Sequence, residues 1–122
     1  MTTYKNLEAW KLGMRIVQQI YIVTKIYPKE ELFALTSQTK RAAVSIPANI
    51  AEGIGRNFKR DTIQFLHISR GSIYELETLL NVATLVNILQ IETFDTIQIM
   101  IEEEKKILNG LINSYETRSD LK

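Results

Sequence analysis

Apolar residues along the chain recur every three or four positions, which is the spacing of one face of an α-helix. No segment competes with this pattern by alternating apolar and polar residues as a β-strand does. The pattern predicts four helices, over residues 7–27, 32–54, 59–87 and 93–116. We take Asn6, Asn57 and Thr93 as candidate N-caps. Pro28 is expected to end the first helix.

The predicted helices have similar lengths and short connections. At 1.5 Å per residue, each is about 30 Å long or longer. Matched amphipathic helices joined by short loops pack as antiparallel neighbours. The sequence therefore predicts one all-α domain over residues 1–122, an antiparallel up-and-down four-helix bundle.

The first predicted helix carries two apolar stripes. One stripe consists of Leu7, Trp10, Met14, Val17 and Tyr21. The other, about a quarter to a third of a turn away, consists of Ala9, Leu12, Ile16, Ile20, Val23 and Tyr27. A bundle helix needs one such stripe, so the second either widens the core or contacts another subunit. We expect an oligomer interface at Ile16, Ile20 and Val23; the alternative is an unusually wide core.

The third and fourth predicted helices each have a main stripe that should face the core. In the third it consists of Leu66, Ser69, Ile73, Leu76, Leu80 and Ala83. In the fourth it consists of Ile97, Ile101, Leu108, Leu111 and Tyr115.

Charge is distributed unevenly along the chain. Residues 1–60 hold ten basic and four acidic side chains, whereas residues 61–122 hold five basic and ten acidic ones, and the net charge is +1. Such asymmetry favours either self-association of complementary faces or a basic face for an acidic partner. The alternative is that the charges cover solvated helix surfaces.

Composition argues against metal, cofactor and membrane functions. The chain has no cysteine and one histidine, His67, so thiolate or imidazole-rich metal sites are not expected. The longest strongly apolar uncharged stretch, residues 78–91, is shorter than the roughly 20 residues of a membrane-spanning helix. The start of the chain does not resemble a targeting segment. We expect a soluble cytoplasmic protein.

Enzyme chemistry has little support in the sequence. His67 has no carboxylate among its helical neighbours, and the serines lack a nucleophile-elbow context. The acidic run at residues 102–106 is interpreted as a solvated helix face, in which Glu102 pairs with Lys106 four residues on. We expect no catalytic residue, no metal and no cofactor.

Residues 40–53 combine small side chains, a proline within a predicted helix and spaced polar groups. Ser45, Asn49 and Glu52 share one helix face. Because unpaired buried polar groups are costly, we expect these three to form a structural polar network that fixes helix pairing. Arg41 or Arg70 could supply a cation for Glu52. The alternative is a ligand or catalytic site.

Three cations lie where the second predicted helix gives way to the third. Arg56, Lys59 and Arg60 surround a predicted helix start, which is a plausible corner for phosphate. Phe58 offers either a stacking surface for a base or a buried hydrophobic contact. With Arg41 and Arg70, which an oligomer could add, these residues are the candidate nucleic-acid-binding set. The alternative is a solvated loop that Asp61 partly neutralises.

Three segments together resemble a known family. They are residues 4–10, residues 35–53, which end in the motif Ser-Ile-x-x-Asn-Ile-Ala-Glu-Gly, and residues 65–76. They look like the four-helix-bundle proteins encoded in intervening sequences of bacterial 23S ribosomal RNA genes. That family is similar to the accessory protein of diversity-generating retroelements, a basic pentamer that works with a reverse transcriptase and binds nucleic acid.

The resemblance implies a homo-oligomer, expected to be a pentamer, with a non-catalytic role near RNA or DNA. It also implies a protein partner such as a reverse transcriptase. The alternative function is a self-assembling scaffold or protein-interaction module with no nucleic-acid role.

Overall fold

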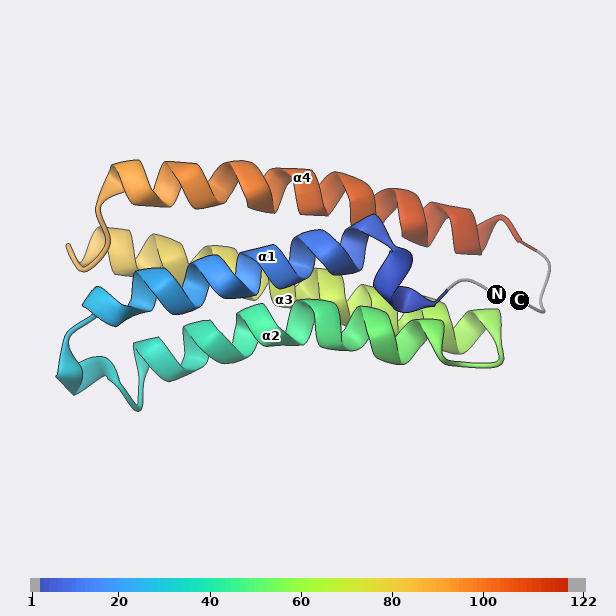
Figure 1. Ribbon diagram of the computed structural model, residues 1–122, viewed down its shortest axis with the longest axis horizontal. Helices are drawn as coiled ribbons and strands as arrows, with labels where there is room; N and C mark the ends of the chain where they lie inside the picture. Colours follow the sequence, from blue (N-terminus) through green and yellow to red (C-terminus); the bar gives the residue numbers. More distant parts are fainter. Residues whose placement is uncertain (1–2, 119–122) are drawn as a thin grey trace.

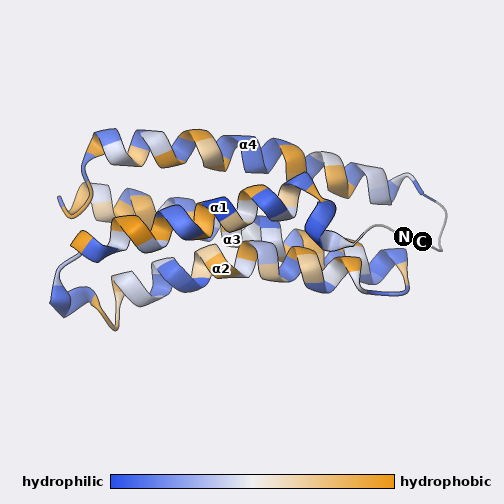
Figure 2. Cartoon of the chain, in the orientation of Figure 1, coloured by the Kyte–Doolittle hydropathy of each residue, from blue (hydrophilic) through white to orange (hydrophobic). Residues whose placement is uncertain are grey.

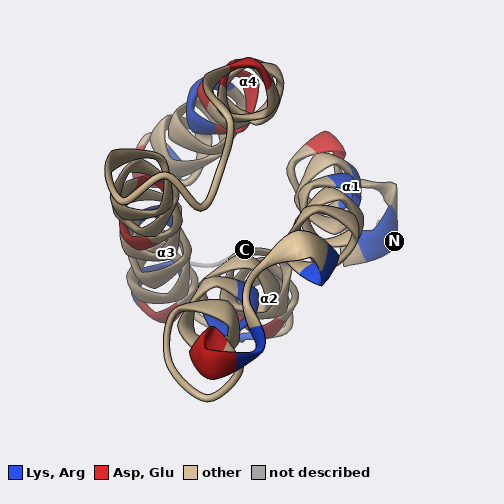
Figure 3. Cartoon of the chain, turned by 90° about the vertical axis from the view of Figure 1, so that its left-hand side faces the viewer, with Lys and Arg blue, Asp and Glu red and all other residues tan. Residues whose placement is uncertain are grey.

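The computed structural model describes residues 3–118 and shows an all-helical bundle, which confirms the predicted fold class (Figure 1). The long helices are α1 (Glu8–Val23), α2 (Leu35–Ile54), α3 (Lys59–Leu85) and α4 (Ile91–Glu116). Short 3-10 turns occupy Tyr4–Asn6, Thr24–Ile26 and Lys29–Glu31. Viewed from one end, α1, α2, α3 and α4 follow one another around the bundle, and α4 returns to contact α1 (Figure 3).

Three of the four predicted helix starts were displaced by one to three residues, whereas α3 begins at Lys59 as predicted. The N-cap residues are Leu7, Phe58 and Gln90 in place of Asn6, Asn57 and Thr93, and none of the three forms a side-chain cap hydrogen bond. α2 begins three residues later than expected, because the chain first makes the separate Lys29–Glu31 turn and then leaves helical geometry at Ala34. Capping residue type was therefore a poor guide here.

The end of α3 is fixed by a left-handed residue. Asn87 has φ 65°, a conformation that Asn tolerates better than most residues. The amide of Asn87 donates to the carbonyl of Thr84, at 3.1 Å, and that of Ile88 donates to Ala83, at 2.8 Å. This pair of bonds is a Schellman motif, which ends the helix and turns the chain toward α4.

The core confirms the α3 stripe and reverses the two stripes of α1. All six predicted residues of the α3 stripe are buried. On α1, however, Ile16 and Ile20 are 0% exposed inside the protomer, whereas Met14 and Tyr21 are 44% and 45% exposed. The interface assignment of Ile16 and Ile20 is therefore wrong, because side chains already enclosed by their own bundle have no surface to offer. Val23, half-buried against the same core, belongs with them.

Every helix carries both hydrophobic and hydrophilic residues, interspersed along its length (Figure 2). Within residues 3–118, no helix is both long and apolar enough to cross a membrane.

Candidate nucleic-acid interface

The turn between α2 and α3 is held tightly at its base. A Cβ placed on the buried Gly53 would lie 2.9 Å from the Cβ of Phe65 and 3.1 Å from the carbonyl oxygen of Thr62. The Thr62 hydroxyl donates to the Gly53 carbonyl at 2.7 Å. Only a glycine lets the two helices approach this closely, so the side chains that follow are presented from a well-packed support.

The three cations at this turn lie at one end of the bundle. Arg56 pairs with Glu52 at 3.1 Å, and its guanidinium carbon lies 4.6 Å from the centre of the Phe65 ring. Lys59 donates from Nζ to the Arg118 carbonyl at 2.8 Å, and Arg60 is exposed. Arg56, Lys59 and Arg60 thus lie at the same turn, as their neighbouring positions in the sequence require.

Phe58 belongs to the same turn in the sequence, and 54% of its surface is exposed. The interpretation of Phe58 as a buried contact is therefore wrong, and its ring can accept a stacked base. Phe58 is also the N-cap residue of α3 and contributes no side-chain cap, so no capping oxygen offsets the positive end of the helix dipole. Asp61 in the first turn opposes this field in part.

Arg41 and Arg70 do not join this cluster within one protomer. Arg41 is exposed on α2, fifteen residues before Arg56, which is about 22 Å of helix. Arg70 is half-buried on α3, where it donates to Asn109 Oδ1 at 2.9 Å and to His67 Nδ1 at 2.8 Å. The five predicted residues therefore form one three-residue cluster and two separate positions.

His67 has a carboxylate neighbour that the local sequence could not indicate. Its Nε2 lies 3.9 Å from Glu116 on α4, while Arg70 donates to its Nδ1. The side chains of His67 and Glu116 are 41% and 47% exposed. The arrangement links α3 to α4 at the surface.

The predicted polar network exists in part and has a different membership. Ser45 and Ser72 share a 2.7 Å hydrogen bond across α2 and α3. Asn49 donates to the carbonyl and hydroxyl oxygens of Ser45, both at 2.8 Å. Glu52 instead faces outward to Arg56, so neither Arg41 nor Arg70 is the cation paired with it. Ser72 was missed because spacing within one helix does not say which residue of the next helix lies opposite.

The acidic run on α4 also departs from the prediction. Glu102 pairs with Lys105 at 3.0 Å rather than with Lys106, and Lys105 reaches across to Glu77 of α3 at 2.9 Å. The hydrogen bond from Lys105 lowers the pKa of Glu102. Glu104 is not solvated: it is 0% exposed, and burial raises its pKa to about 8. Among the described residues, no three His, Asp or Glu side chains are arranged to hold a metal ion.

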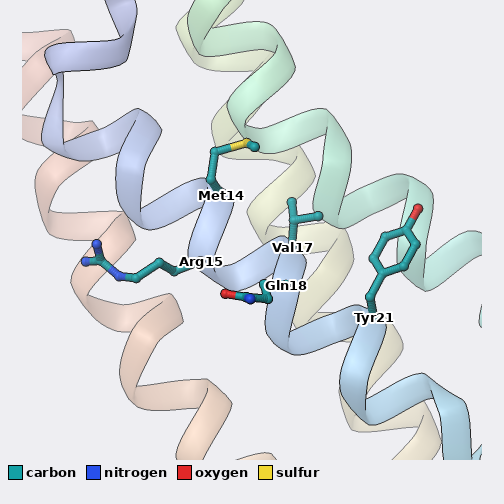
Figure 4. Close-up of a pocket in the computed structure, with 5 residues that line it drawn as sticks. All are labelled: Met14, Arg15, Val17, Gln18 and Tyr21. Carbon is teal, nitrogen blue, oxygen red and sulfur yellow. The ribbon is translucent and has the colours of Figure 1, made fainter.

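A second surface feature is an apolar strip on α1, which we call the α1 face and define as Met14, Val17 and Tyr21. Together with Arg15 and Gln18 these residues line an open pocket (Figure 4). Met14, Val17 and Tyr21 point to the α2 side of the helix and Arg15 to the α4 side (Figure 4). Lys40 of α2 lies 4.7 Å from the centre of the Tyr21 ring, so the α1 face is apolar with basic edges.

Comparison with known proteins identifies a matching family and a solved structure with a similar fold. The family model for the 23S rRNA-intervening sequence protein matches residues 5–110. A crystal structure of a protein of unknown function from the S23 ribosomal protein family of Bacteroides thetaiotaomicron is similar, with a TM-score of 0.79 and 22% identity. The match covers 86% of this chain and 95% of that one, and at this identity it concerns the fold. No curated protein matches.

Proposed function

Because the chain belongs to the 23S rRNA-intervening sequence protein family, we propose that it is a non-catalytic homo-oligomer that associates with RNA or DNA. The observation that carries the proposal is that Arg56, Lys59 and Arg60 lie at the same turn as Phe58, whose ring is exposed. A pentamer is the assembly that we propose, and a protein that acts on the same nucleic acid is the proposed further partner.

The chemistry of the cluster suits a nucleic-acid backbone. Cations placed beside a helix N-terminus attract phosphate, and an exposed aromatic ring stacks on an unpaired base. Three cations make a weak site, so affinity would depend on repetition of the cluster around an oligomer. Self-association is thus part of the mechanism rather than a separate property.

Two features support self-association. The α1 face leaves Met14 and Tyr21 nearly half exposed, and burying the remaining surface of each would contribute about 1 kcal/mol. The charge asymmetry adds complementarity, because α1 and α2 carry cations such as Arg15 and Lys40 while the exposed side of α4 carries Asp95 and Glu103. A heterologous contact between such faces produces a ring or a filament.

The proposal is tested by fluorescence anisotropy of a structured RNA across a salt series. We expect binding that weakens with salt, and substitution of Arg56, Lys59 and Arg60 by Ala should reduce both the affinity and the salt slope. The matched control replaces Lys25, Lys29 and Lys106, which removes the same charge away from the cluster. Equal losses for both variants, or no RNA binding by the unaltered protein, would overturn the site; circular dichroism confirms that both variants are folded.

A self-assembling scaffold or protein-interaction module is the second candidate, and the α1 face is the observation that favours it. On this alternative the oligomer forms, but neither RNA nor DNA binds at low salt. Measuring solution mass and nucleic-acid binding on the same preparation separates the two functions.

A further inference from the structure

Within residues 3–118, one carboxylic acid is buried in the core without a hydrogen-bond partner. Glu104 of α4 is 0% exposed, and neither of its carboxyl oxygens has a hydrogen-bond partner. It occupies the core position between Ile101 and Leu108 in a stripe that is otherwise apolar. An ionised carboxylate without a partner is very costly in such surroundings, so the side chain is held as the neutral acid.

Three helices meet around this acid. A Cβ built on Gly13 of α1 would lie 3.1 Å from Glu104 Oε2 and 3.3 Å from the Cβ of Pro47, which is buried within α2. Gly13 therefore leaves the room that the carboxyl group occupies, and Pro47 borders the same contact. Because Gly13 has no side chain, the Glu104 carboxyl group fits against α1 at this point.

The surroundings offer little compensation for a negative charge. Arg15 of α1 attracts an ionised Glu104, and Glu103 on α4 itself repels it. On α2 the neighbouring residue is the uncharged Pro47. The stripe of α3 that faces the core, which includes Ser69 and Ile73, is also uncharged. Desolvation outweighs the attraction of Arg15, so the acid loses its proton only at a pH well above its ordinary range.

We propose that Glu104 is a proton-dependent lock between α1 and α4: as the neutral acid it closes the core against Gly13 and Pro47, and loss of its proton opens this contact. The ionised side chain would leave the core in the direction of Arg15, which lies on the α4 side of α1. The lock is a property of the single bundle and does not depend on nucleic-acid binding.

The direction of the pH effect follows from linkage. Glu104 has a pKa raised to about 8 in the folded protein, against an ordinary value of 4.5 in the unfolded chain. Between these pH values the folded state holds a proton that the unfolded state has released, so rising pH favours unfolding. The unfolding equilibrium constant should increase by up to about tenfold per pH unit in this window and level off above it.

The test is urea unfolding at a fixed protein concentration between pH 5 and pH 9. Glu104→Gln keeps the shape of the neutral acid, so this variant should lose the pH dependence that the unaltered protein shows and be the more stable of the two at pH 9. Glu103→Gln is the matched control on the adjacent, exposed position; it removes only the minor repulsion from that carboxylate and should retain the dependence. Identical pH profiles for the unaltered protein and Glu104→Gln would overturn the proposal.

Two measurements on the unaltered protein keep the proposal open to refutation if Glu104→Gln does not fold. Carboxyl-carbon NMR should show one glutamate that titrates near pH 8 rather than in the ordinary range. Hydrogen exchange, corrected for its intrinsic pH dependence, should show that α1 and α4 amides around Gly13 and Glu104 lose protection above that pH before those of the α2–α3 pair. A full set of ordinary glutamate titrations, or uniform loss of protection in all four helices, would contradict the lock.

Discussion

Individual residues decide where the helices of this bundle touch, and the glycines show how far a sequence can predict this. Residues 40–53 are rich in small side chains, and Gly53 at their end makes a close contact with Thr62 and Phe65. Gly71 and Gly110 look equivalent in the sequence, yet a Cβ on either meets nothing within 4 Å. Residue type alone does not distinguish a packing glycine from one in open space.

Gly53→Ala should destabilise the protein, and Gly110→Ala should stabilise it. The first adds a methyl group 2.9 Å from the Phe65 Cβ, an overpacking that typically costs about 1–3 kcal/mol. The second replaces glycine in an exposed stretch of α4, where alanine is favoured by about 0.5–1 kcal/mol. Thermal melts of both variants check the prediction. Equal changes in melting temperature would mean that the Gly53 contact is not a tight one.

Glu104 marks a second limit of prediction at this scale. Its spacing from Ile101 and Leu108 placed it on the inward stripe of α4, a signal that was available in the sequence. The adjacent charges of the run 102–106 suggested a solvated face instead. The burial of an acid depends on what the neighbouring helices leave empty, here at Gly13, and a one-dimensional pattern does not contain that information.

At the scale of the helices, periodicity predicted the number, order and approximate length of the helices and the rotation of α3, but it did not decide the rotation of α1 or all of the helix ends. The two apolar stripes of α1 are similar in length, so their hydrophobicity could not decide which one faces the core. In the structure, the stripe that contains Ile16 and Ile20 faces the core. The starts of α1 and α4 were misplaced because Leu7 and Gln90 precede these helices without side-chain caps.

The contact between α3 and α4 gives a test at the element scale. Lys105 pairs with Glu77 at 2.9 Å, with side-chain exposures of 20% and 21%, and lies 5.5 Å from the centre of the Tyr74 ring. Lys105→Met should destabilise the bundle by about 1–3 kcal/mol, because Glu77 is left half-buried without its cation. Lys106→Met, on the next residue and exposed, should change little. Urea unfolding of the two variants measures the difference, and similar midpoints would show that the Lys105 pair contributes nothing specific.

For the whole molecule, the bundle still exposes more apolar surface than a single subunit needs, but other residues of α1 provide it than the sequence predicted. Ile16 and Ile20 are buried, whereas Met14 and Tyr21 are partly exposed to solvent. The apolar surface available for association therefore lies a fraction of a turn away around α1. The nucleic-acid site changes at the same scale. Three of its five cations lie at the turn between α2 and α3, and joining them to Arg41 requires neighbouring copies of the chain.

Substitutions on α1 therefore distinguish assembly from folding. Met14→Glu combined with Tyr21→Glu should give a folded protein of lower mass, since it places acids on the α1 face, whose proposed partner surface on α4 is itself acidic. Ile22→Glu, on the same helix but outside the α1 face, should leave the mass unchanged. Light scattering and circular dichroism give the mass and the fold of each variant.

Ile16→Lys completes this comparison, because the two interpretations of α1 predict opposite results for it. If Ile16 lay in an interface, the variant would be a folded protein of reduced mass. Because it is fully buried within the protomer, a lysine there places an unpaired cation in the core, and we expect unfolding at ordinary temperature. A folded Ile16→Lys monomer would restore the interface assignment. An unaltered protein that is monomeric from micromolar to millimolar concentration would instead remove self-association, and with it the repetition that the nucleic-acid site requires.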